Sequence, residues 1–267
     1  MALASMSELK DKVSEWLGKG GYPLEMRVAQ RLQRAGFGVV QSEYYEDPES
    51  GKWRETDVIA YEHHQGKTCR AIFSLVVECK SAKDKPWVLF TATDPYPRQL
   101  SVSRRASTEA GRSVLNILSL NDELRRSALF AVPERPGYGL TIALRNNEQD
   151  AAYEALQSVC KAALGIVARH GAIATENILP FAWPVIVINA PLFESYLDSD
   201  GTLQTESIEK GLLIWKNPLV SRHTIVQVYT ENAFFSEAEQ YRSNVLDLLQ
   251  AATAEHDRAP RVKPAER

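Results

Sequence analysis

One segment, residues 69–80, most constrains the fold of this chain, because it is a long run of β-branched, aliphatic and aromatic residues. Such a run is typical of a central strand that is covered on both faces. The sheet that holds this strand therefore needs packed layers on both sides, and the rest of the sequence contains several amphipathic helical patterns that can supply them. We expect an α/β fold in which a mixed sheet is flanked by helices.

The segments before this strand contain clear start and stop signals. Residues 7–17 are predicted to form a short helix that ends at the glycines beginning with Gly18. A second helix has Pro23 in its first turn, apolar residues at helical spacing and Gly36 as its stop. The predicted order is helix, strand, turn, strand, turn and strand, over residues 23–35, 37–45, 46–52, 56–61, 63–67 and 69–80.

Beyond residue 80, prolines interrupt the periodic pattern, and the predictions rest on shorter signals. The predicted elements are a strand at 87–90, a helix at 103–118, a hairpin of 129–132 with 139–144, a helix at 149–170, strands at 185–190, 211–215 and 224–229, and a helix at 236–250. The expected organisation is an N-terminal helix over 1–18, a core over 19–90, an α/β extension or second lobe over 91–252, and a flexible tail over 253–267.

Composition excludes several classes of protein. A hydrophobic content of 44% and a charged content of 24% are ordinary for a globular chain, so disordered and fibrous classes are excluded. We expect no membrane association, because no apolar run reaches the roughly 20 residues of a membrane-spanning helix, and the first ten residues lack a secretory pattern. Three scattered cysteines cannot form a disulfide framework or a thiolate metal cage, so a reducing cytoplasm is the expected compartment.

The formal net charge of −3 argues against a protein that coats nucleic acid without specificity, because such proteins are usually strongly basic. It argues less against an enzyme that cuts nucleic acid. Carboxylates that hold metal ions lower the total charge, and substrate binding needs only one basic face.

Two predicted strands each present a carboxylate: Asp57 on the second strand and Glu78 on the third, where Lys80 follows. Because strand side chains alternate, Glu78 and Lys80 point to one face while Val77 and Cys79 point to the other. Charges on a buried strand are costly unless they are paired or bind a metal. Hard oxygen ligands suit Mg²⁺ or Mn²⁺, which can activate water and neutralise charge on a phosphodiester, with the lysine as an electrostatic donor.

These residues resemble the signature of the PD-(D/E)XK nuclease superfamily, whose core is a helix followed by strands that carry an Asp and then a Glu-x-Lys. Asp57, Glu78 and Lys80 match those positions, although Thr56 stands where the family name has Pro. In many members, such as Holliday junction resolvases and type IV restriction enzymes, the preceding helix adds a Glu, which Glu25 matches. The resemblance covers about residues 19–90 and implies a restriction endonuclease-like core with Mg²⁺ or Mn²⁺ held by Asp57 and Glu78.

Simpler interpretations of these residues stay open. Glu25 suits a helix N-terminus whatever the function, and Glu78 with Lys80 can be only an ion pair on one strand face. Cys79 faces away from the motif and is expected in core packing. His63 and His64 are expected to be solvated in a turn.

Two hypotheses for function follow. The first is a metal-dependent nuclease that hydrolyses phosphodiester bonds, with DNA as its expected substrate, a role in defence or DNA processing, and homodimerisation as in nucleases that cut both strands. The second is a non-catalytic nucleic-acid or partner-binding module on the same fold. A set of aromatic and basic residues are candidates for stacking on bases or contacting phosphates, and ordinary solvated surface is the alternative for them: Tyr44, Tyr45, Trp53, Arg54, Lys83, Lys85, Arg104, Arg105, Arg125 and Arg126. The segment 191–194 follows a buried strand and has no chemistry that assigns it a role.

Overall fold

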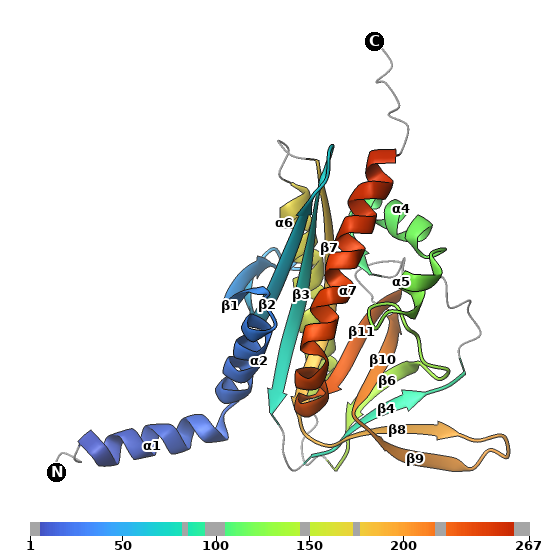
Figure 1. Ribbon diagram of the computed structural model, residues 1–267. Coiled ribbons are helices and arrows are strands. Elements are labelled where there is room, and N and C mark those ends of the chain that lie inside the picture. Colours follow the sequence, from blue (N-terminus) through green and yellow to red (C-terminus); the bar gives the residue numbers. More distant parts are fainter. Residues whose placement is uncertain are drawn as a thin grey trace.

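A computed structural model gives the fold of this chain and describes residues 6–81, 85–93, 105–144, 150–172, 177–216 and 223–258. The fold is α/β, with one large mixed sheet and helices on both of its faces, as expected from the sequence (Figure 1). Within the described ranges, none of the helices combines the length and the apolarity that crossing a membrane requires.

The sheet follows the order β1-β2-β3-β7-β11-β10-β6-β4-β8-β9, and the short β5 pairs with β7 beside this path. Its strands are β1 (Gly38–Glu46), β2 (Trp53–Gln65), β3 (Arg70–Ser81), β4 (Trp87–Thr91), β5 (Ala106–Ser107), β6 (Gly137–Ile142), β7 (Ile178–Asn189), β8 (Leu192–Leu197), β9 (Leu203–Ile208), β10 (Lys210–Lys216) and β11 (His223–Thr230). β1, β2 and β3 form an antiparallel meander, whereas β3, β7 and β11 run parallel.

The central strands β3 and β7 pair in parallel from Arg70 opposite Ile178 to Ser81 opposite Asn189. Both strands are buried over most of their length, which confirms the expectation of a central strand covered on both faces. Strands from before and after residue 90 therefore belong to one continuous sheet.

The helices are α1 (Met6–Lys19), α2 (Tyr22–Arg34), α4 (Glu109–Leu118), α5 (Asp122–Arg126), α6 (Ala151–Gly171) and α7 (Glu231–Arg258). α2, α4 and α7 supply the apolar cluster on one face of the sheet, and α6 supplies the cluster on the other. α1 projects from the body and contacts α2 (Figure 1).

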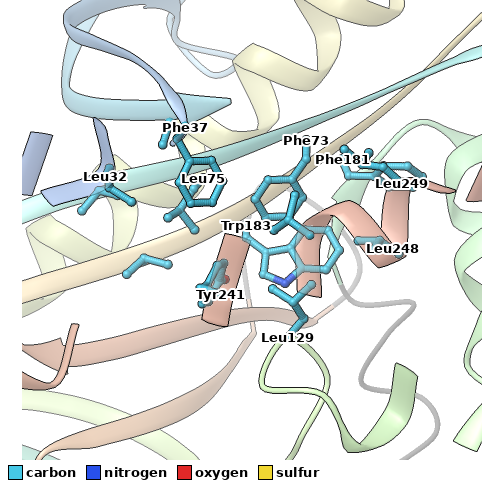
Figure 2. Packing of buried hydrophobic residues seen from close by; sticks show 14 of the residues in the cluster. Leu32, Phe37, Phe73, Leu75, Leu129, Phe181, Trp183, Tyr241, Leu248 and Leu249 are labelled. Atoms are coloured by element: carbon cyan, nitrogen blue, oxygen red, sulfur yellow. The ribbon is translucent and has the colours of Figure 1, made fainter. Parts of the chain in front are cut away.

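The larger of the two apolar clusters centres on aromatic side chains from the middle strands (Figure 2). Phe73 and Trp183 come from the paired strands β3 and β7, and their ring centroids lie 5.1 Å apart. Leu129 packs beneath Trp183 from the segment after α5, while Leu248 and Leu249 enter from α7. Because each buried aromatic removes about 150–250 Å² from water, this cluster fixes α7 against the sheet.

Two of the sequence predictions after residue 80 are wrong. Residues 129–132 do not form a hairpin with 139–144: β6 pairs instead with β4 and β10, and backbone turns from Ser127 carry Leu129 into the core. The helix predicted over 103–118 starts only at Glu109, because Thr108 caps it and Ala106–Ser107 pairs with β7.

The C-terminal helix and the second strand extend farther than predicted. α7 continues to Arg258, so residues 253–258 are helical and not part of a flexible tail; residues 259–267 lie outside the described ranges. β2 continues to Gln65, so His63 and His64 lie in a strand rather than a turn. A contact between the end of α7 and the β2–β3 turn explains why both elements are long.

Candidate functional site

The candidate site lies where β2 separates from β3. Pairing between the two strands ends at Val58 opposite Val77. Beyond that pair, the backbone N–H of Cys79 donates to the Asp57 carboxylate (Oδ2) over 2.7 Å, so a side chain occupies the place of the next backbone partner. β3 meanwhile stays paired with β7 as far as Ser81. We call this opening, bounded by Asp57 and Glu78, the strand fork.

The partner strand on the other side of Asp57 is also irregular. Ser42 of β1 lies across from Asp57, between the pairs Gln41–Val58 and Glu43–Thr56, and has φ +53°. Residues other than glycine rarely adopt this left-handed conformation. The sheet is therefore distorted on both sides of Asp57.

Glu78 projects from β3 toward α6 and is 5% exposed. Its Oε1 accepts from Lys80 Nζ over 2.6 Å, and its Oε2 accepts from the Ser158 hydroxyl of α6 over 2.9 Å. The alternation of strand side chains thus places Glu78 and Lys80 together, as the sequence predicts. Ser158 was missed because its only sequence signal is a polar position within a helix of apolar periodicity.

Glu25 lies in the first turn of α2 and is partly buried. Burial raises the pKa of Glu25; nearby Lys80 acts to lower it, while Glu55 and Glu78 raise it further. Glu25 therefore lies close enough to Lys80 and Glu78 for their charges to shift its pKa, although α2 covers the face of the sheet opposite to α6.

Among the acids of the strand fork, Asp57 has the most strongly raised pKa. Its pKa is raised to about 7, first by burial and then by the neighbouring carboxylate of Glu78; the Cys79 amide and Lys80 oppose the rise. Burial acts to lower the pKa of Lys80, but Glu78 and Asp57 outweigh it and raise that pKa, so the ammonium stays charged. Three carboxyl groups around one ammonium leave an excess of negative charge.

This donor set fits a hard divalent cation. Carboxylate oxygens are the ligands that Mg²⁺ and Mn²⁺ prefer, and such ions usually take one or two carboxylates with water and phosphate completing the shell. Asp57 Oδ1 has no hydrogen-bond partner in the described part of the chain. The acidic oxygens of Glu25, Asp57 and Glu78 do not all lie within 4.8 Å of one another, so these three acids do not form a closed three-acid cage.

Cys79 contributes only its backbone to the strand fork. Its side chain belongs to the apolar cluster under α2 and α7, and burial raises its pKa well above the ordinary value. A buried neutral thiol of this kind is core packing, in agreement with the sequence prediction.

Elsewhere in the described residues, Cys69, His256 and Asp257 bring three potential ligand atoms within 4.8 Å of one another, which the acids of the strand fork do not. The Asp257 carboxylate already accepts from the backbone N–H groups of Lys67 and Thr68, at 2.9 Å each, and from the Thr68 hydroxyl. The group therefore acts as a clamp that ties the end of α7 to the β2–β3 turn. This clamp explains the length of both elements.

Several residues predicted to contact phosphates or bases have other roles. Arg105 is 3% exposed, donates to the carbonyls of Leu129 and Ile225, and lies 5.0 Å from the centroid of the Trp183 ring, so its prediction as a phosphate contact is wrong. Tyr45 is also buried and cannot stack on bases. Lys83 and Arg104 lie outside the described residues.

The other predicted contacts are accessible to different degrees. Tyr44 and Trp53 are exposed on the hairpin that carries Asp57, and Arg54 beside them pairs with the buried Asp47 at 2.7 Å. Lys85 is partly buried before β4. Arg125 pairs with Asp122 at 3.2 Å, and Arg126 donates to the Asp122 carbonyl.

The segment 191–194 leads into β8 and carries one ordered acid. Glu194 accepts from Arg135 over 2.9 Å and from Thr91 over 3.2 Å, and these contacts connect β8, β4 and the segment before β6. No protein-family model, no curated protein and no solved structure matches this chain.

Proposed function

We propose that this protein is a metal-dependent nuclease that hydrolyses phosphodiester bonds, with DNA as its substrate. The observation that carries the proposal is the meeting of Asp57, Glu78 and Lys80 at the strand fork, where two strands separate and leave buried acids beside one held ammonium. The resemblance of Glu25, Asp57 and Glu78-x-Lys80 to the PD-(D/E)XK superfamily supports the same function.

In this proposal, Asp57 and Glu78 would hold Mg²⁺ or Mn²⁺, and the bound ion would supply water activation and neutralisation of phosphate charge. Lys80 places its ammonium against the developing negative charge, a role for which its raised pKa keeps it protonated. Ser158 orients Glu78 through its hydroxyl, and Glu25 supplies an auxiliary carboxyl at the same end of the sheet.

The proposal also includes a cellular compartment and a biological role. Three free, buried cysteines agree with a reducing cytoplasm. A role in defence or DNA processing, and a homodimer that cuts both strands, are what the resemblance to restriction enzymes and resolvases implies.

The exposed aromatic residues Tyr44 and Trp53 favour one alternative, a module that binds nucleic acid without cutting it. Exposed rings on a hairpin are suited to stacking on bases. The ion pair of Glu78 with Lys80 is compatible with this alternative, because it would also persist as a structural contact.

A cleavage assay separates the two functions. Supercoiled plasmid, linear duplex, single-stranded DNA and RNA are each incubated with the protein in Mg²⁺, Mn²⁺ or EDTA. We expect cleavage of DNA that EDTA abolishes and that Glu78→Gln removes. The matched control is Glu194→Gln, which alters a mostly buried, ion-paired glutamate elsewhere and should leave cleavage unchanged. Binding of DNA without metal-dependent cleavage would favour the alternative.

A further inference from the structure

Three potential metal ligands meet where the end of α7 contacts the β2–β3 turn. Cys69 is the residue before β3, and His256 and Asp257 belong to the last turn of α7. One ligand atom of each residue lies within 4.8 Å of the other two. The fold thus brings a thiol, an imidazole and a carboxylate together from distant parts of the chain.

The Asp257 carboxylate is held in place and still has room for an ion. It accepts from the backbone N–H groups of Lys67 and Thr68 at 2.9 Å each, and from the Thr68 hydroxyl over 2.5 Å. A carboxylate offers about four lone-pair sites, so these three donors leave one for a metal. Carboxylates that bind metals are usually oriented by hydrogen bonds of this kind.

The His256 ring is held only loosely by its protein partners. Its Nδ1 lies 3.3 Å from the Thr68 hydroxyl oxygen, and its Nε2 lies 3.4 Å from the side-chain nitrogen of Asn177. Both distances are beyond the usual range of hydrogen bonds. One ring nitrogen can therefore bind an ion while the other keeps its contact, which is the usual arrangement of a metal-bound histidine.

Cys69 supplies the third ligand from the inside of the turn. It is 2% exposed, whereas His256 and Asp257 are partly exposed, so an ion can enter from solvent. Burial and the neighbouring charge of Asp257 raise the pKa of this thiol to about 11, and a metal that binds the thiolate would release its proton to solvent. Gly66 permits the close approach of α7, because a Cβ there would lie 2.8 Å from Thr253 Cβ.

We propose that Cys69, His256 and Asp257 bind one Zn²⁺, with water as the fourth ligand. Thiolate, imidazole and carboxylate are the ligand types of zinc sites, and one thiolate with one carboxylate balances the charge of the ion. A tetrahedral Zn²⁺ holds its ligand atoms about 3.5 Å apart, a spacing that small rotations of the two helix side chains can reach. Mg²⁺ does not fit this site, because it prefers oxygen ligands. The bound Zn²⁺ fixes the end of α7 to the β2–β3 turn.

Optical titration of the metal-free, full-length protein with Co²⁺ tests the proposal, because a cobalt–thiolate bond gives a charge-transfer band in the near ultraviolet. We expect this band to saturate at one Co²⁺ per chain, to disappear when Zn²⁺ is added, and to persist in a large excess of Mg²⁺. Zn²⁺ should also raise the melting temperature of the protein. Absence of the band, or its removal by Mg²⁺, would overturn the proposal.

Matched variants locate the ion. Cys69→Ser should abolish the cobalt–thiolate band, whereas Cys160→Ser, the same change at a buried cysteine of α6, should keep it. Asp257→Asn should weaken Zn²⁺ binding at least tenfold, and Asp247→Asn on the same helix should not. If Cys69→Ser does not fold, His256→Gln decides, because it changes a partly exposed side chain. Unchanged Zn²⁺ affinity in His256→Gln would overturn the proposal.

The zinc site is independent of the proposed nuclease site. Cys69 and Glu78 are separated by about 30 Å of extended chain, because each strand residue advances the backbone by about 3.3 Å. Glu78→Gln should therefore bind Zn²⁺ with unchanged affinity, whether or not the protein cuts DNA. Loss of the cobalt–thiolate band in Glu78→Gln would show that the ion binds at the strand fork instead.

Discussion

The Ser158 hydroxyl of α6 donates to Glu78 Oε2 over 2.9 Å, although 80 positions separate the two residues in the chain. The same carboxylate receives Lys80 on its other oxygen. Glu78 is thus held from two sides before any ion binds, one contact coming from its own strand and one from the helix that covers it. Groups that hold a metal ligand in this way tune the affinity of the site.

Replacement of Ser158 by Ala should weaken Mn²⁺ binding about tenfold to a hundredfold, the usual effect of removing such a support. Ser158→Thr keeps the hydroxyl and should restore most of the affinity. Calorimetric titration with Mn²⁺ measures both, and Ser113→Ala on α4 is the control. Equal losses in the Ala and Thr variants would mean that packing, and not the hydroxyl, matters at this position.

Replacement of Lys80 by Ala should abolish cleavage while most metal binding remains, because Lys80 is assigned to the transition state. Glu78→Ala should lose both metal and activity, because it removes a ligand. Cleavage assays and Mn²⁺ titrations of the two variants, side by side, check this division of roles. Equal losses of metal affinity would contradict it.

The part of the site that could be predicted from the sequence is the part that follows from the alternation of side chains along one strand. A period of two along residues 69–80 is enough to place Glu78 and Lys80 on one face. Ser158 could not be found in this way, because its position depends on how α6 crosses the sheet before β7 pairs with β3. The same limit explains the wrong hairpin: β6 has its partners, β4 and β10, far away in the sequence.

Asp57 should make the metal-free protein less stable as the pH rises. Its folded-state pKa is about 7 against an ordinary value of 3.8, so the folded state binds the proton more tightly. The stabilising contribution is complete below about pH 3.8 and is lost as the pH rises through about 7. Urea denaturation across this range should show that loss, and Asp57→Asn should remove it.

Divalent metal provides the matching control for Asp57. An ion bound between Asp57 and Glu78 stabilises the charged forms, so saturating Mg²⁺ should restore stability near and above pH 7 and have little effect near pH 4. A metal effect of the same size at both pH values would show that the ion binds elsewhere.

The last prediction concerns Arg105, a candidate phosphate contact from the sequence that is buried in the core of the structure. Burial lowers its pKa to about 10, so the guanidinium is charged at neutral pH, and no carboxylate of the described residues pairs with it. Its contacts are the Leu129 and Ile225 carbonyls and the face of Trp183. Arg105→Ala removes these contacts and opens a cavity, and should lower the free energy of unfolding by roughly 2–5 kcal/mol in urea denaturation.

Arg126 of α5 is the exposed counterpart. Arg126→Ala should change the free energy of unfolding by no more than about 0.5 kcal/mol. If Arg126 contacts a phosphate, its loss should also flatten the dependence of DNA affinity on salt by about 0.9 in logarithmic slope, whereas Arg105→Ala should leave that slope unchanged below its unfolding temperature. A flatter slope in Arg105→Ala, with stability intact, would place Arg105 at the DNA after all and contradict its role as a core cation that holds Leu129 and Trp183 together.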